Sequence, residues 1–227
     1  MSMTAPVCVF TCDAPPWNRR EILRYAGVRN RNADFDEGLE RCIAEIEDQL
    51  IYRVCYRELP ILIDQDAVDL GFLKTSSHAL RKNLCGCDRI LLFAATVGLA
   101  PDRMIARYAA LSPTKALWMQ AIGAERIESL CECFATAMRE QKREEGLLTR
   151  PRFSPGYGDF SIDAQKDIFA VLDCQRKLGL TLNESLLMSP TKSVTAIIGL
   201  TRNTGESFLG DGCAVCQTKE CIYRRKQ

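Results

Sequence analysis

Residues 89–98 read RILLFAATVG, a continuous apolar run that ends at a glycine. A run of this kind, closed by a turn residue, is typical of a strand that is buried on both faces of a sheet. We therefore predict a central strand over 89–97. Both faces of this strand must be covered by other parts of the chain, so the segments before and after it in the sequence determine the architecture.

Downstream of the central strand the apolar spacing becomes helical. We predict helices over 102–111 and 113–144, and Pro113 suits the first turn of the second one. One apolar stripe runs along that longer helix. Its members are Leu117, Ala121, Ala124, Cys131, Phe134 and Met138. The longer helix is expected to form the spine of the fold.

A loop rich in glycine, proline and aromatic residues follows at 145–161. A further helix is predicted over 162–178, where apolar residues again recur at helical spacing. Residues 182–188 and 193–200 read as strands, and the Ser-Pro-Thr-Lys sequence between them predicts a hairpin.

The first part of the chain mixes both kinds of pattern. Helices are predicted over 18–28, 35–56 and 77–84, and 61–72 has enough β-branched and alternating residues for one or two strands. Helices and strands that intermix without regular βαβ units favour an α+β fold. We expect a single domain of long helices packed on a largely antiparallel or mixed sheet, and not a Rossmann fold.

Length and composition fit one large domain over 1–202 and a polar, cysteine-containing tail over 203–227. The 30 basic and 29 acidic residues leave no charge excess that would indicate nucleic acid or an anionic membrane as a partner. No stretch reaches the roughly 18 apolar residues of a membrane span, and the N-terminus lacks an export signal. We expect a cytoplasmic protein in which Cys42, Cys55 and Cys174 are reduced, buried small residues.

The most informative stretch is RFSPGYGD at 152–159. It is followed by a predicted helix, by Thr-Leu-Asn-Glu-Ser at 181–185 and by Ser-Val-Thr-Ala at 193–196. An Arg-x-x-Pro-Gly-Tyr turn alone is a weak signal, but these elements stand in register over about fifty residues. In content, order and approximate spacing they resemble the activation domain of cobalamin-dependent methionine synthase. The resemblance is closest over 152–199 and extends more loosely over 89–138.

The resemblance implies a binding site for S-adenosylmethionine. The ligand residues that it implies are Arg152, Ser154 (through its backbone), Pro155, Gly156 and Tyr157. A guanidinium can bind the ligand carboxylate in a bidentate pair, Pro-Gly fixes a tight turn, and tyrosine offers a ring face and a hydroxyl. The resemblance also implies a carboxylate in the long helix that precedes the motif. Glu128 is the candidate, and Ser129 takes the matching position if the alignment shifts by one residue.

These residues also have ordinary structural interpretations. Arg-x-x-Pro-Gly-Tyr can be a rigid turn between helices, with Tyr157 packed on the core and Arg152 capping a helix end. Glu184 and Ser185 fit a ligand contact or an exposed strand position about equally well. Gly98 fits a ligand contact at a strand end or a plain turn.

The chain lacks the Asp-x-His-x-x-Gly motif of the corrinoid-binding module of methionine synthase. Its single histidine, His78, does not fit that motif and is expected at a surface or helix start. Cobalamin must therefore come from a partner, either a corrinoid-carrying methionine synthase or another corrinoid methyltransferase, on which the chain acts in trans.

The resemblance also implies the chemistry. A one-electron donor reduces cob(II)alamin, and the sulfonium methyl of S-adenosylmethionine traps the cob(I) form. Because cobalt is the nucleophile, the chain needs none of its own. It places the methyl group and excludes water, and Glu128 lies near the sulfonium as the catalytic carboxylate.

The tail carries a cysteine pattern that the resemblance does not explain, at the place where the longer enzyme supplies a further aromatic ligand contact. The pattern is Cys-x-x-Cys-x-x-x-x-Cys, formed by Cys213, Cys216 and Cys221. It fits zinc or an iron–sulfur cluster with a fourth ligand from Cys12, Cys85 or Cys87, and it also fits reduced thiols in a flexible tail. Cys131 and Cys133 lie two positions apart on a helix, which argues against a shared metal.

Two other classes of function compete with the activation role. A regulatory module would bind S-adenosylmethionine without catalysing methyl transfer. A metal or redox adaptor centred on the tail would bind Fe or Zn and lose it on Cys213→Ser with Cys216→Ser.

Overall fold

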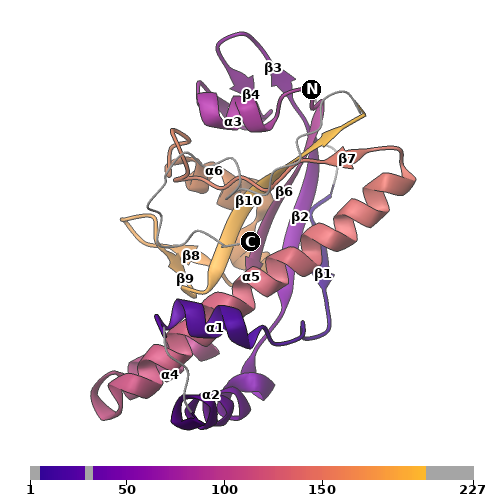
Figure 1. The fold of residues 1–227 in the computed structure, drawn as a ribbon. Coiled ribbons are helices and arrows are strands. Elements are labelled where there is room, and N and C mark those ends of the chain that lie inside the picture. Colours follow the sequence, from indigo (N-terminus) through magenta and orange to yellow (C-terminus); the bar gives the residue numbers. More distant parts are fainter. Residues whose placement is uncertain (1–5, 29–32, 203–227) are drawn as a thin grey trace.

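The computed structural model describes residues 6–28 and 33–202, and its centre is a five-stranded antiparallel sheet (Figure 1). In spatial order the strands are β1 (Cys8–Thr11), β2 (Arg53–Pro60), β6 (Arg89–Thr96), β10 (Ser193–Thr201) and β7 (Leu148–Thr149). β6 lies between the two other long strands, and all of its residues from Ile90 to Thr96 are buried. The prediction of a central strand is confirmed.

Helices cover both faces of this sheet. They are α5 (Pro113–Glu144) on one face, and α6 (Ala164–Leu172) with α7 (Cys174–Leu178) on the other. Successive side chains of a strand point to opposite faces. Leu91 and Phe93 of β6 accordingly share a core cluster with α5, whereas Leu92 and Ala94 share one with α6 and α7. The two-sided cover explains why the β6 sequence is continuously apolar.

The long helix α5 extends beyond the sheet, where three other helices pack around its first half (Figure 1). These are α1 (Arg19–Tyr25), α2 (Ala33–Ile46) and α4 (Ala100–Leu111). Ile22, Leu39 and Trp118 are buried in the core that they form with α5. The helix predicted over 113–144 is confirmed with the same bounds.

A buried ion pair fixes the N-terminal segment to α5. Arg126 is fully buried, forms a salt bridge with Glu125 at 2.5 Å and donates hydrogen bonds to the carbonyls of Pro15 and Pro16. Its guanidinium also lies 3.9 Å from the ring centroid of Trp17. The charge is thus compensated on every side, as burial of a guanidinium requires.

Two smaller sheets complete the fold. One contains β3 (Leu62–Ile63), β4 (Val68–Asp69) and β5 (Lys74–Thr75), and leads into α3 (His78–Asn83). The other is the hairpin of β8 (Thr181–Leu182) and β9 (Met188–Ser189). The expected α+β class with a largely antiparallel sheet is confirmed. Within residues 6–28 and 33–202, no helix combines the length and the apolarity that a membrane crossing needs.

The helix predicted over 35–56 is wrong in its second half. The chain leaves α2 at Ile46, passes through the 3-10 turn η1 (Glu47–Gln49) and becomes strand β2. Apolar spacing of three and four continues through Val54 by coincidence, because Val54 and Cys55 are buried on opposite faces of the sheet. Pairing with β6 along the whole of β2 decides the outcome.

The helix predicted over 162–178 is divided in two, and the predicted hairpin is also wrong. Asp173 adopts a left-handed conformation (φ 50°), which separates α6 from α7. Residues 182–188 do not pair with 193–200. β10 pairs with β6 and β7 instead, because a strand apolar on both faces needs two neighbours and two covered faces.

Candidate functional site

The motif found in the sequence lies in a loop that extends the edge of the main sheet. We call residues 150–163 the arginine loop. After β7 its backbone continues along β10, since Arg150 N donates to Gly199 O and Phe153 exchanges two hydrogen bonds of 2.8 Å with Ile197. The start of the arginine loop is therefore hydrogen-bonded to β10 in the way that an edge strand would be.

Strand-like geometry determines where Arg152 points. Phe153 packs on the core that faces α6 and α7, so its neighbour Arg152 is directed to the α5 face. There Arg152 Nη2 lies 2.5 Å from Glu128 Oε2. The two side chains are 23% and 32% exposed, so the ion pair is open to solvent on one side. Ser129, the alternative position for the carboxylate, donates its hydroxyl to Glu125 at 2.6 Å instead.

The surroundings of Arg152 keep it charged and keep the nearest thiol neutral. Burial alone would lower the pKa of Arg152, but nearby acidic groups, among them the carboxylates of Glu128 and Glu132, outweigh it and raise that pKa. Cys131 is completely buried beneath the guanidinium, and desolvation raises the pKa of its thiol to about 12. At neutral pH the site contains a cation, at least one carboxylate and a protonated thiol.

The second part of the arginine loop is a tight turn. Tyr157 N donates to Ser154 O (3.3 Å), and Gly156 N donates to Phe160 O (2.8 Å). Gly156 has a φ of +87°, a conformation that glycine adopts without strain. Pro155 is buried beneath the turn, whereas Tyr157 is 67% exposed. Tyr157 is largely exposed and Arg152 pairs with Glu128, so neither side chain has the role that the structural interpretation gave it, whereas the turn itself is rigid.

A clamp between the arginine loop and α3 was not predicted from the sequence. Asp159 accepts hydrogen bonds from Ser77 Oγ (2.6 Å), His78 N (2.7 Å) and Ala79 N (3.0 Å). The neighbouring Gly158 lies so close to α3 that a Cβ at this position would come within 2.8 Å of Ala79 Cβ. The turn that carries Tyr157 is thereby fixed at both ends.

The clamp gives the stability of the loop a specific dependence on pH. Hydrogen bonds from Ser77 Oγ and from two backbone N–H groups lower the pKa of Asp159 to about 2. A carboxylate whose pKa is lowered on folding stabilises the fold above its unfolded pKa, about 3.9. We expect this contribution to vanish as pH falls from about 4 to about 2, and Asp159→Asn to lack it at every pH.

The free energy of unfolding in urea, measured for wild type and Asp159→Asn between these pH values, tests this expectation. The control is Asp66→Asn, which replaces an exposed aspartate between β3 and β4. Parallel pH profiles for wild type and Asp159→Asn would contradict the clamp.

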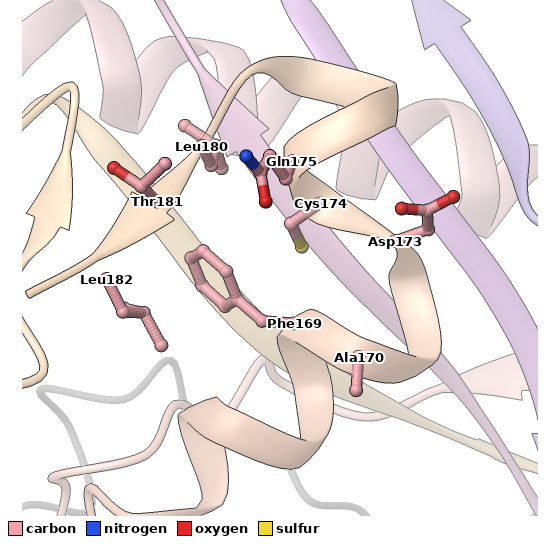
Figure 2. A pocket seen from close by; sticks show the side chains of 8 residues that line it. All are labelled: Phe169, Ala170, Asp173, Cys174, Gln175, Leu180, Thr181 and Leu182. Carbon is pink, nitrogen blue, oxygen red and sulfur yellow. The ribbon is translucent and has the colours of Figure 1, made fainter.

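A separate open pocket of about 480 Å³ lies beside α6, α7 and β8 (Figure 2). Its lining residues are Phe169, Ala170, Asp173, Cys174, Gln175, Leu180, Thr181 and Leu182. None belongs to the predicted ligand site. Cys174 and Phe169 pack on the α6 side of the sheet, whereas Arg152 faces α5. The only charged lining residue is Asp173, so this pocket offers no cation for a ligand carboxylate.

The structure also shows the surroundings of the other residues singled out in the sequence. His78 is exposed at the start of α3, Gly98 N donates to Thr96 Oγ1, and Glu184 and Ser185 are exposed near the β8–β9 turn. Cys42, Cys55 and Cys174 are buried free thiols, as expected. The tail cysteines Cys213, Cys216 and Cys221 lie outside the described residues. Among residues 6–28 and 33–202, no group of three potential ligands could hold a metal ion.

Comparisons with known proteins found a matching family model and solved structures of similar fold. A family model described as "Vitamin B12 dependent methionine synthase, activation domain" matches residues 79–209, which is 131 of the 227 residues. A crystal structure of the MetH reactivation domain bound to AdoHcy is similar in fold, with a TM-score of 0.61 and 14% identity over 89% of this chain and 80% of that chain. No curated protein matches the chain. The matched region includes the whole arginine loop and Glu128, and it ends before Cys213.

Proposed function

Because the chain belongs to the family of vitamin B12 dependent methionine synthase activation domains, we propose that it binds S-adenosylmethionine at the arginine loop. We further propose that it acts in trans, supporting reductive methylation of the cobalamin that a partner methionine synthase carries. A one-electron donor is required as a third component.

The observation that carries this proposal is the open ion pair of Arg152 and Glu128. The amino-acid end of S-adenosylmethionine has a carboxylate and an ammonium group side by side. Arg152 can take the carboxylate in a bidentate pair, and Glu128 can take the ammonium or face the nearby sulfonium. Both side chains are already partly desolvated and held in place, so little ordering is required when the ligand binds.

The turn of the arginine loop suits the rest of the ligand. Gly156 lacks a side chain and has an exposed backbone, which permits close approach of a ligand. The ring of Tyr157 is exposed and offers an aromatic face on which an adenine can stack. The Ser154 backbone lies between Arg152 and this turn and completes the contact surface.

When bound, S-adenosylmethionine supplies an electrophilic methyl group, and the reduced cobalt of the partner is the nucleophile that takes it. Arg152 and Tyr157 hold the two ends of the ligand and so fix the direction in which the methyl group points. The Cys131 thiol interacts with Arg152, but burial keeps it protonated at neutral pH. A thiol reacts as a nucleophile only as the thiolate, so Cys131 does not compete for the methyl group.

A reconstitution assay tests the function. The full chain is mixed with a cobalamin-dependent methionine synthase that lacks its own activation domain, a one-electron donor and S-adenosylmethionine labelled in the methyl group. We expect label in methylcobalamin only when the chain is present, and loss of that transfer with Arg152→Ala.

The control is Arg176→Ala, which removes an exposed arginine paired with Asp173 on the opposite side of the sheet. Ligand binding without transfer to any corrinoid protein would favour the regulatory module. Transfer to a corrinoid methyltransferase other than methionine synthase would keep the chemistry and change the partner.

A further inference from the structure

The short helix α3 contacts the arginine loop on both sides of the proposed ligand residues. On the first side, Asn83 Nδ2 donates a 3.1 Å hydrogen bond to Pro151 O, one residue before Arg152. On the second side, Asp159 accepts the three hydrogen bonds of the clamp from the N-terminal end of α3. Asn83 is the last residue of α3, so the two contacts lie about 8 Å apart along the helix.

The pairing of the arginine loop with β10 is irregular around Arg152. Four steps along the chain from β7 into the loop match only three steps along β10, because the paired residues are Thr149 with Leu200 and Phe153 with Ile197. One extra residue on one strand of an antiparallel pair is a β-bulge, and bulges next to binding sites change the direction in which a side chain points. β10 alone therefore does not determine the orientation of Arg152.

Asn83 supplies the contact that β10 lacks at this point. Pro151 O belongs to the planar peptide that joins Pro151 to Arg152, so a hydrogen bond to that oxygen fixes the plane from which Arg152 extends. In the part of the chain that the structure describes, β10 makes no backbone hydrogen bond to this peptide. The turn after α3 adds a further contact, because Arg150 Nη2 donates to Cys85 O at 2.9 Å.

α3 is itself fixed to the core of the domain. Leu80 and Leu84 are fully buried in the core cluster that faces α6 and α7. In the turn that follows α3, Gly86 O accepts a 2.6 Å hydrogen bond from Thr201 Oγ1 at the end of β10. A short helix held in this way is a rigid spacer between Asn83 and the clamp.

We propose that α3 sets the separation between Arg152 and Tyr157, the two ligand anchors, an inference that rests on the proposed function. Asn83 is the positioning residue for Arg152, and Asp159 is the positioning residue for Tyr157. Each acts through the anchor that it holds and does not touch the ligand. S-adenosylmethionine has its carboxylate and its adenine at opposite ends, so anchors held at a matching separation reduce the ordering that binding requires.

Calorimetric titration of S-adenosylmethionine into variants of the full chain tests the role of Asn83. Asn83→Ala should raise Kd roughly 3–10-fold, the effect of one lost hydrogen bond. In an Arg152→Ala background the same substitution should change Kd less than about 2-fold, because the anchor through which it acts is gone. Asn83→Asp has the same size but cannot donate to Pro151 O, so it should behave like Asn83→Ala. Lys82→Ala, an exposed position of α3, is the control and should bind like the wild type.

The second anchor provides the crossed experiment. Asp159→Ala should weaken binding in the wild-type and Arg152→Ala backgrounds alike, but not in Tyr157→Ala. General damage to the fold would weaken binding equally in every background, and that result, or unchanged affinity in Asn83→Ala, would overturn the inference while the proposed function stands. Absence of S-adenosylmethionine binding by the wild type would overturn the proposed function and this inference together.

Discussion

Arg152→Ala is expected to weaken binding of S-adenosylmethionine by about 2 kcal/mol or more, which is about 30-fold or greater in Kd. The wild-type guanidinium is held beside Glu128 by partial burial and a short ion pair, so it meets the ligand carboxylate without reorganising. Without it, the ligand carboxylate loses its bidentate partner and Glu128 opposes it with a like charge. Calorimetric titration measures the difference.

A conservative substitution sharpens this experiment. Arg152→Lys keeps the charge but not the planar fork, so we expect it to recover only part of the affinity. Arg176→Ala should bind the ligand like the wild type. If Arg152→Ala bound S-adenosylmethionine as tightly as the wild type, the ligand site would have to lie elsewhere in the chain.

Arg126→Ala is expected to lower the free energy of unfolding by about 3–5 kcal/mol. The substitution leaves Glu125 as a buried charge without its partner, since Glu125 is only 1% exposed. It also removes both hydrogen bonds to Pro15 and Pro16 and the contact with Trp17. Urea unfolding followed by circular dichroism gives the free energy directly.

A second variant separates the effect of the unpaired Glu125 carboxylate from the effect of the side-chain volume that Arg126→Ala removes. Arg126→Met with Glu125→Gln removes both charges together and keeps most of the packing, so we expect it to be markedly more stable than Arg126→Ala. Equal destabilisation of the two variants would show that the anchoring hydrogen bonds, and not the unpaired carboxylate, account for the loss.

Elements with one dominant local signal could be predicted from the sequence. α5 has a proline at its first turn and apolar residues that recur at helical spacing on either side of the buried Glu125–Arg126 pair, and β6 is apolar from Ile90 to Ala95. β2 could not be predicted, because its apolar residues continue the helical spacing of α2 and only pairing with β6 identifies the strand. The break at Asp173 has no local signal, since a non-glycine residue in the left-handed region is uncommon.

The residues of the candidate site also divide into those that a local sequence motif identified and those that only the structure shows. Arg152, Pro155, Gly156 and Tyr157 form one short motif, and the family resemblance suggested Glu128 as the carboxylate of the site, although its ion pair with Arg152 was not predicted. The clamp by Asp159 was not predicted, because it joins segments about 80 residues apart in the sequence. A serine that starts a helix was visible at Ser77, but nothing in the sequence shows which distant carboxylate will meet it.

The pairing of β6 with β10 has a consequence for synthesis of the chain. Thr96 meets Ser193 and Arg89 meets Leu200, so one edge of the most apolar strand has no partner until the ribosome has made about a hundred more residues. At translation rates of about 5–20 residues per second this interval lasts roughly 5–20 s. During that time the nascent chain exposes an unpaired, apolar strand edge, a surface prone to pair with other chains.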